Sequence, residues 1–496
     1  MMANAFALAA SVVVTLFTLP ILVSGLGPVR YGIWVVTGTL VSYFGLLDLG
    51  LRAAVTTYVA RDHAVGNHHG ASATVSAGLF TRQWMGLAAV VVSLLIATVL
   101  ARLLQIPPDL VWEARQALVA CTVALAVSLI GGVFAAVLQA MNRQDVVATA
   151  TITQTLIRAI GTVVLMRNGY SIMALAVLQV VAELIANALI VQRCFRLYPQ
   201  LRLSFSAPSR EMLVGLGGFS GEMALWQLFS LIITAGPPLV IGAMLSPAAV
   251  TLYVLGGYLV AVVEQIRLAI TLVFTPLASR YDAAGNRIAL RDLLRRGTRL
   301  VLIVVLPILV GLLARGETFL RVWTGPEYSG PAGEVLRVLS VSMVFASAMA
   351  PGGAIILGLG RQREALVWLA VQAAATLSLA VVLARSMGIV GVAWAGAAPT
   401  LFGIAFTCVA CRLVRVSLVR HVVGDWGRPV VAVVPFAVAC FVTDHYWEAT
   451  SMPGFFVQMA AVFPVYVLSC VAFLGSDLKR GWVMLYGPRV DEDRPR

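Results

Sequence analysis

A small set of ionisable side chains lies inside stretches of sequence that are otherwise apolar. The arginines of this set are Arg52, Arg158 and Arg267, and the acids are Asp48, Glu183, Glu222 and Glu264. Arginine carries a planar, permanently charged group whose N–H donors suit phosphate oxygens. The arginines are therefore candidates for binding an anionic phosphate group, and the acids are candidates for balancing the arginines or carrying a coupling proton.

Two of the acids precede an arginine at helical spacing. Asp48 lies four residues before Arg52, and Glu264 lies three residues before Arg267. Residues at these spacings are neighbours on one face of an α-helix. Each couple is therefore predicted to neutralise itself on a single helix.

Arg158, Glu183 and Glu222 have no partner of opposite charge at helical spacing. Three interpretations of the whole set stay open. The charges form ion pairs between helices, the side chains of Arg52 and Arg267 extend to the inner membrane surface, or the arginines bind a phosphate group that crosses the membrane.

Other kinds of chemistry find little support in the sequence. The couple His68-His69 lacks further ligands at metal spacing and is expected to be solvated. The phosphate-loop pattern Gly-x-x-x-x-Gly-Lys is absent from the sequence. We therefore expect no catalytic residue, no cofactor and no metal site.

The composition places these charges in a membrane protein. The chain has 496 residues, of which 60% are hydrophobic and 11% charged, and its mean hydropathy is +0.93. Apolar runs of about 20 residues, the length that crosses a bilayer, recur along the chain. Each run must be helical, because lipid offers the backbone no hydrogen-bond partners. The predicted fold class is an all-α polytopic membrane protein.

The apolar runs predict about 14 membrane spans. Their residues are 3–25, 31–60, 78–101, 116–141, 145–166, 171–192, 212–243, 249–279, 299–314, 335–359, 364–384, 388–411, 428–443 and 455–475. The linkers between them are too short to form a soluble domain.

The distribution of basic residues predicts the orientation of the chain. The even-numbered linkers and the C-terminal tail hold a roughly threefold excess of arginine and lysine, which marks the cytoplasmic side. Both termini are therefore expected to be cytoplasmic, and the net charge of +13 is attributed to orientation and lipid contacts and not to nucleic acid. This assignment places Arg82 in a cytoplasmic linker and Arg315 in an outer one. Residues 286–299 are predicted to form an amphipathic helix on the inner leaflet.

Residues 26–67 recur at 245–286 without a gap. The two copies share a Leu-x-Pro entrance and the exit pattern Arg-x-x-Ala-x-Gly-Asn. Such a repeat predicts two like-oriented lobes built from six spans each. The predicted domains are an N-terminal lobe at 1–200, a C-terminal lobe at 201–420, and an appended pair of spans with a basic tail at 421–496.

The sequence resembles a known family in several short segments. They are 26–34, which begins Leu26-Gly27-Pro28, then 43–51, 58–61, and the outer run 316–325. In these segments the chain is similar to the polysaccharide-transport proteins. These are the Wzx-type flippases of lipid-linked oligosaccharides in the multidrug/oligosaccharidyl-lipid/polysaccharide (MOP) superfamily.

The resemblance implies a mechanism and a cargo. Two six-helix lobes would form a V around a cavity that opens to each side in turn. The cargo would be a polyprenyl-pyrophosphate-linked glycan, moved from the inner to the outer leaflet of the bacterial cytoplasmic membrane. The implied partners are that lipid-linked glycan, membrane lipids, and glycan polymerase or assembly proteins. Many such flippases have twelve spans, whereas fourteen resembles the lipid II flippases, in which the additional pair borders a groove for the lipid tail.

Two other functions stay open at this point. A cation-coupled multidrug antiporter of the same superfamily commonly places a carboxylate in an early helix of a lobe, but residues 3–25 contain no acid. A polytopic glycosyltransferase or glycan polymerase would need catalytic clusters in sizeable outer loops, and the loops here are short.

Overall fold

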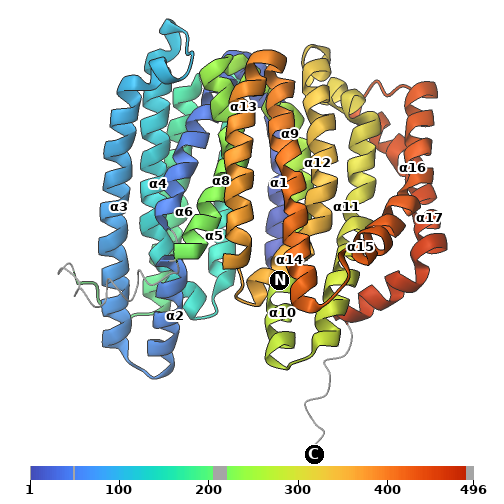
Figure 1. Ribbon diagram of the computed structural model, residues 1–496. Helices are drawn as coiled ribbons and strands as arrows, with labels where there is room; N and C mark the ends of the chain where they lie inside the picture. Colours follow the sequence, from blue (N-terminus) through green and yellow to red (C-terminus); the bar gives the residue numbers. More distant parts are fainter. Residues whose placement is uncertain (1, 49–50, 205–220, 487–496) are drawn as a thin grey trace, which may run out of the picture. The chain divides into compact units, whose positions relative to one another are not determined.

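The computed structural model describes residues 2–48, 51–204 and 221–486, and the secondary structure in these ranges is helical (Figure 1). Its first elements are α1 (Met2–Phe44), η1 (Gly45–Asp48), α2 (Leu51–Ala64), α3 (His68–Leu103), η2 (Pro108–Leu110), α4 (Val111–Ala140), α5 (Gln144–Arg167), α6 (Ile172–Leu197) and α8 (Gly221–Met244). They are followed by α9 (Pro247–Thr271), α10 (Phe274–Ala283), α11 (Arg287–Thr324), α12 (Pro326–Gly358), α13 (Arg363–Ala397) and η3 (Ala398–Gly403). The chain ends with α14 (Ile404–Val414), α15 (Leu418–His421), η4 (Val422–Trp426), α16 (Gly427–Tyr446) and α17 (Met452–Tyr486).

Twelve helices in the described ranges are long and apolar enough to cross a membrane. The fold is therefore an all-α polytopic membrane protein, as predicted, but the predicted count of fourteen spans is not confirmed. The helix at Val14–Phe44 and the segment Arg363–Val414 each cover parts of two predicted spans. The beginning of the predicted span 212–243 lies outside the described residues.

Glycines with positive φ interrupt both of these long segments. Gly27 in α1 has φ 75°, and Gly388 in α13 has φ 59°. A straight helix of 43 residues would be roughly 65 Å long, about twice the hydrocarbon thickness. Glycine adopts the left-handed conformation at little cost, and Figure 1 shows the chain of α13 reversing direction along its length.

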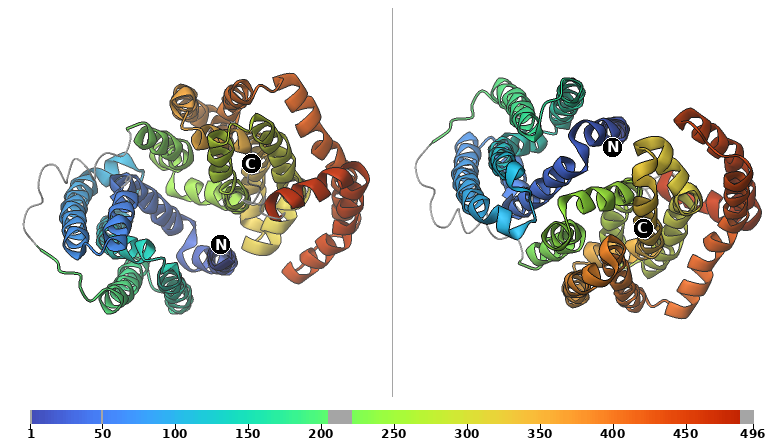
Figure 2. Two further views of the ribbon diagram at one scale, coloured as in Figure 1. Left: turned by 90° about the horizontal axis from the view of Figure 1, so that it is seen from below. Right: turned by 90° about the horizontal axis from the view of Figure 1, so that it is seen from above.

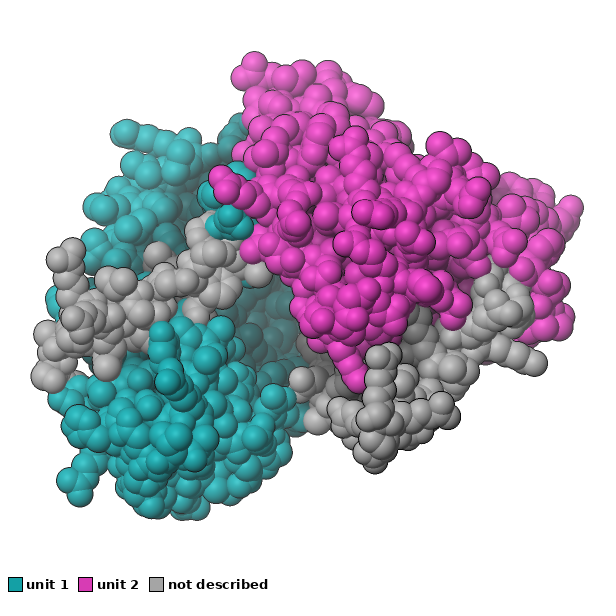
Figure 3. Space-filling view, turned by 60° about the horizontal axis from the view of Figure 1, so that its bottom comes forward, with its two compact units in different colours: residues 1–251 teal, residues 252–496 magenta. Residues whose placement is uncertain are grey.

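The chain folds into two compact units, residues 1–251 and 252–496 (Figure 3). In the N-terminal unit α8 packs against α1, where Gly242 lies beside Val36. The predicted boundary between the lobes at residue 200 is based on the repeat in the sequence, and it stays a prediction. Seen end-on, the helices within each unit run roughly parallel to one another (Figure 2).

The repeated exit pattern forms the same turn in both copies. Gly66 has φ 70° and Gly285 has φ 63°, so each turn depends on a left-handed residue. Directly after it, Asn67 and Asn286 each accept a hydrogen bond of 3.0 Å from the backbone N–H three residues later. A side-chain acceptor at this position caps the first turn of a helix. The shared residues therefore specify how the chain leaves one helix and begins the next.

A second pair of turns also agrees between the copies. Asn142 has φ 57° and Gly360 has φ 67°, and in each case the next residue donates its backbone N–H to the preceding helix, Arg143 at 2.8 Å and Arg361 at 3.0 Å. The side chain of Arg143 also donates a hydrogen bond of 3.0 Å from Nε to the exposed Asp145 carboxylate.

Each unit has an apolar core of its own. In the N-terminal unit, buried valines and alanines of α2, α3, α4 and α6 pack together with Tyr198. In the C-terminal unit, Leu302 and Leu306 of α11 pack against Phe436 of α16 and Tyr466 of α17. The last two helices lie along one edge of this unit (Figure 2) and are joined to it through α11.

The variant Gly285→Ala tests the turn between α10 and α11. No atom would contact the added methyl group, so its cost comes from the left-handed backbone alone, about 1–2 kcal/mol. We expect the melting temperature of the purified protein in detergent to fall by about 2–4 °C. Gly353→Ala, in equally open space within α12, is the control and should not lower it.

Candidate functional site

Arg158 of α5 and Glu183 of α6 form an ion pair between neighbouring helices. Nη2 of Arg158 lies 3.1 Å from Oε2 of Glu183. Each residue lies roughly ten residues, or about 15 Å, from the turn that joins the two helices, which places the pair at membrane depth. The interpretation of interhelical ion pairs is therefore confirmed for these two residues.

Two amide side chains complete the surroundings of the Glu183 carboxylate. Gln154 donates a hydrogen bond to Oε2, and Asn187 donates one of 3.2 Å to Oε1. The amide of Asn187 fits against Gly131 of α4, where a Cβ atom would lie 1.5 Å from its oxygen. Glu183 is thus held by three donors, and its side chain is only 11% exposed.

The guanidinium of Arg158 keeps donors that Glu183 does not use. A guanidinium has five N–H groups, and among the described residues Nε of Arg158 has no hydrogen-bond partner. The side chain is 40% exposed, although it lies at membrane depth. The carboxylate therefore orients a charged group that still has capacity to bind an anion.

Arg267 and Glu264 of α9 pair as the sequence spacing predicted. Nε of Arg267 lies 2.6 Å from Oε2 of Glu264, and its Nη2 donates to the other carboxylate oxygen. Two N–H groups of the guanidinium therefore bind the two carboxylate oxygens, which makes this a bidentate contact. Arg267 is 15% exposed and has fewer remaining donors than Arg158.

The other predicted site residues are not brought into these pairs. Arg52 lies on an exposed face of α2. The side chain of Asp48 lies outside the described residues, and with it the predicted contact of Asp48 with Arg52. Glu222, in the first turn of α8, is half-buried.

Two buried arginines were assigned to the wrong places by the sequence. Arg82 lies well inside α3 and is 1% exposed, so it belongs to the predicted span 78–101 and not to the cytoplasmic linker with which its charge was counted. Its Nη1 donates to the backbone carbonyl of Leu129 at 2.7 Å. Arg315 lies inside α11 and is fully buried, not in an outer loop. Polar neighbours in the sequence made both positions resemble the ends of spans.

Arg315 joins α11 to the C-terminal pair of helices. Its Nε lies 3.1 Å from a carboxylate oxygen of Asp444 in α16, and its Nη2 donates to Gln458 in α17. The guanidinium also lies over the ring of Phe455, 5.1 Å from its centroid. Thr318 donates a further hydrogen bond of 2.9 Å to Asp444.

The predicted amphipathic helix at 286–299 is the beginning of α11 and not a separate surface helix. Its leucines are buried within the protein, so the apolar face was recognised but its partner was not. Its basic face is bound as well. Arg295 and Arg299 both contact the buried carboxylate of Asp425, at 3.1 and 2.5 Å, and His421 lies 2.9 Å from the same carboxylate.

His68 is also not simply solvated, because its Nδ1 lies 2.9 Å from the hydroxyl of Tyr198. This contact ties the start of α3 to the end of α6. The neighbouring His63 meets the ring of Tyr198 edge-on.

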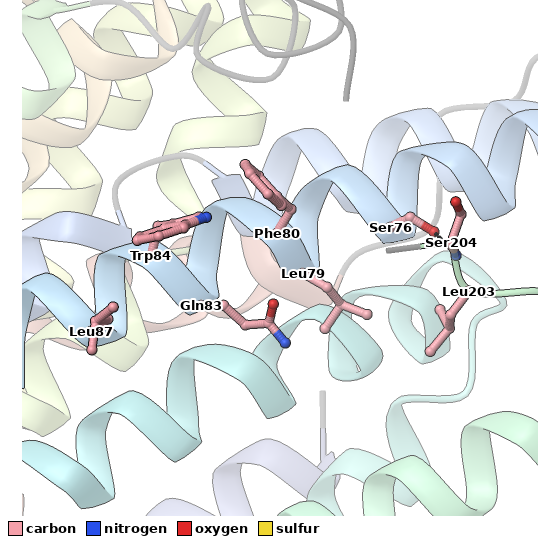
Figure 4. Close-up of a pocket in the computed structure, with 8 residues that line it drawn as sticks. All are labelled: Ser76, Leu79, Phe80, Gln83, Trp84, Leu87, Leu203 and Ser204. Carbon is pink, nitrogen blue, oxygen red and sulfur yellow. Dashed lines mark hydrogen bonds between the residues drawn. The ribbon is translucent and has the colours of Figure 1, made fainter. Parts of the chain in front are cut away.

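A pocket of about 360 Å³ lies along α3 (Figure 4). It is lined by Ser76, Leu79, Phe80, Gln83, Trp84, Leu87, Leu203 and Ser204. The hydroxyl of Ser76 accepts a hydrogen bond of 2.9 Å from the backbone N–H of Ser204, which holds the strip after α6 against α3. Its described lining is mainly apolar and contains no charged side chain, so it does not fit a phosphate group.

Comparison with known proteins identifies the family. A family model described as "Polysaccharide biosynthesis protein" matches residues 26–332. The chain belongs to this family. It is a family of flippases in the MOP superfamily, as the short sequence segments suggested. Among curated protein sequences, none matches the chain significantly.

Solved structures agree with the fold of this polysaccharide biosynthesis protein. The lipid II flippase MurJ, in an inward closed conformation, aligns with a TM-score of 0.74 and 13% identity, covering 96% of this chain and 100% of that one. An inward-facing multidrug resistance transporter of the MATE family aligns with a TM-score of 0.68 and 16% identity, covering 81% of this chain and 94% of that one. At these identities the likeness concerns the fold alone.

The pair formed by Arg158 and Glu183 can be tested by a double-mutant cycle. Arg158→Gln leaves a buried carboxylate without its cation, and Glu183→Gln leaves a cation at membrane depth without its anion, so each alone should destabilise the protein. In the double variant neither charge is left, and the combined loss should fall short of the sum by about 1–3 kcal/mol. The measurement is unfolding in detergent. Arg167→Gln, at the exposed end of α5, should change stability by less than about 0.5 kcal/mol. Additive losses would show that the two groups do not interact.

Proposed function

We propose that this protein is a flippase that moves a polyprenyl-pyrophosphate-linked oligosaccharide or polysaccharide precursor across the bacterial cytoplasmic membrane. Both termini lie in the cytoplasm, and transport runs from the inner to the outer leaflet by alternating access. The proposed partners are the lipid-linked glycan, the surrounding lipids, and the polymerase or assembly proteins that use the exported glycan.

The observation that carries the proposal is the state of Arg158. A permanent positive charge at membrane depth is costly unless it has a function or a partner. Here Glu183 binds Nη2 of the guanidinium, Nε has no hydrogen-bond partner among the described residues, and the side chain stays 40% exposed. This arrangement suits a group that binds a phosphate oxygen transiently and returns to its carboxylate partner afterwards.

The paired acids explain how such arginines are tolerated between transport cycles. Glu264 binds two N–H donors on one edge of the Arg267 guanidinium, Nε and Nη2, so this arginine is neutralised when no cargo is bound. A bound phosphate competes with the carboxylate for the same donors. Binding of the cargo therefore exchanges one anion for another and avoids leaving a bare charge in the membrane.

The family and the charges together favour a glycan carrier over a drug antiporter. The family match is to polysaccharide biosynthesis, and the candidate cargo contacts are cationic. A site for organic cations would need carboxylates with unused acceptors. Within the described residues, both Glu183 and Glu264 are already occupied by arginine.

The proposal predicts the effect of removing each arginine in cells. In a deletion strain complemented with each variant, Arg158→Ala and Arg267→Ala should reduce surface glycan by at least about tenfold, because one strong phosphate contact contributes roughly 1.5–3 kcal/mol. Immunoblots of the membrane fraction should show the same amount of protein. Arg167→Ala, on the same helix as Arg158 but at its exposed end, is the matched control and should export normally.

The same strains separate the competing functions. Lipid-linked glycan should accumulate on the inner leaflet of the Arg158→Ala strain, while resistance to cationic drugs stays unchanged. Normal surface glycan in both arginine variants would refute the assignment of these residues. A loss of drug resistance with normal glycan would instead identify an antiporter.

A further inference from the structure

The strip of chain that follows α6, residues 198–204, forms one wall of the pocket along α3. Two serines of α3 hold its backbone. The N–H of Arg202 donates to the Ser72 hydroxyl at 3.1 Å, and the N–H of Ser204 donates to the Ser76 hydroxyl at 2.9 Å. Side chains alternate along an extended strip, so Leu203 lines the pocket while Arg202 is exposed. The pocket is therefore built by hydrogen bonds that fix the strip on α3.

The lining of the pocket changes from polar to apolar along α3. Ser76 and Ser204 line the end near the turn between α2 and α3, Trp84 and Leu87 line the other end, and Gln83 lies between them (Figure 4). Ser76 and Leu87 are about 16 Å apart along the helix. One leaflet of hydrocarbon is about 15 Å thick. The pocket therefore matches one lipid chain and its polar ester group in both length and polarity.

The apolar end of the pocket opens on the outer face of α3. Trp84 is 59% exposed and Leu87 53% exposed, whereas Leu79 beneath them is buried. Val91 and Leu95 continue this exposed face at helical spacing. A continuous exposed apolar face on a membrane-spanning helix is a surface for lipid tails. A lipid chain can therefore enter the pocket sideways from the bilayer.

The polar end of the pocket lies next to positive charge. Arg193 and Arg196 are exposed at the end of α6, and Arg202 is exposed on the strip. The sequence contains no acid at 184–204 or at 68–103, which are the segments that wall the pocket. Each arginine near a membrane surface adds attraction for an anionic lipid. Arg202 directly precedes Leu203, so a phosphate beside Arg202 is in reach of a chain that passes Leu203.

We propose that the pocket along α3 binds an anionic phospholipid of the adjacent leaflet, which is the inner leaflet in the proposed orientation. One acyl chain lies between α3 and the strip, against Leu79, Phe80 and Trp84. The phosphate lies outside the pocket, beside Arg202, because the lining itself carries no charge. This lipid is a resident partner of the protein and not its cargo, so the site is additional to the proposed function.

Native mass spectrometry of the purified full-length chain tests the recognition of the headgroup. The probes are dioleoyl phosphatidylglycerol and dioleoyl phosphatidylcholine, which have the same acyl chains and differ in net charge. We expect the first phosphatidylglycerol to bind at least about fivefold more tightly than the first phosphatidylcholine. The double variant Arg196→Gln/Arg202→Gln should abolish this preference. Arg167→Gln, at the exposed far end of α5, is the control and should keep it.

A second pair of variants tests the pocket for the acyl chain. Leu87→Trp places a larger ring in the pocket and should raise the Kd for both lipids at least about fivefold. Leu95→Trp places the same ring on the same face of α3, beyond the residues that line the pocket, and should stay within about twofold. Leu87 and Leu95 are both more than half exposed, so both variants should fold normally.

Three results would overturn the proposal. Equal affinity of the unmodified chain for the two lipids would mean that headgroup charge is not recognised. Equal effects of Leu87→Trp and Leu95→Trp would mean that lipid only coats the surface of α3. Undecaprenyl phosphate that binds more tightly than phosphatidylglycerol, and loses this binding in Leu87→Trp, would assign the pocket to the tail of the cargo.

Discussion

A guanidinium group stays charged at any pH a cell experiences, and a lipid bilayer offers it neither water nor counter-ions. Many polar contacts in this protein therefore serve to give an arginine a partner. Each buried or half-buried arginine described above is met by a carboxylate, a backbone carbonyl or an amide from another turn or another helix. The apolar residues make the helices insert, but the arginines determine which helices must be neighbours, because an incorrect pairing would leave a charge in hydrocarbon.

The sequence was sufficient to predict a contact where the two partners are close together in the chain. The pair Glu264–Arg267 follows from helical spacing, and the turns at Gly66 and Gly285 follow from the repeat together with the rarity of left-handed residues outside glycine. The helical, membrane-spanning fold follows from the length of the apolar runs. In each of these cases the partners are a few residues apart, so the pattern in the sequence is also the pattern in space.

The sequence was insufficient to predict a contact where the contact depends on how two helices are aligned. Arg82 lies beside polar residues and so resembled the edge of a span, although α3 begins at His68 and Arg82 is buried well inside it. Arg52 and Arg82 lie about equally far along the sequence from the turn between α2 and α3, and this spacing alone predicts that the two side chains lie at the same level of the two helices. The partners of Arg315 lie more than a hundred residues away, and no local pattern could have identified them.

Evolution by duplication explains why the two units agree in some places and differ in others. The turns are alike because each must satisfy the same unpaired backbone groups at a helix start. The charged positions differ, because the repeat aligns Asp48 with Arg267 and Gly45 with Glu264.

The attachment of the last two helices has a mechanical meaning. α11 is bonded near one end to Asp425 in η4, directly before α16, and near the other end to Asp444 of α16, and between them the hydroxyl of Tyr466 in α17 donates to the Ile303 carbonyl. Three separated contacts along α11 oppose movement of the pair relative to that helix. We therefore expect α11 and the pair to move as one rigid body, so that a tilt of α11 would displace the outer edge of the pair furthest.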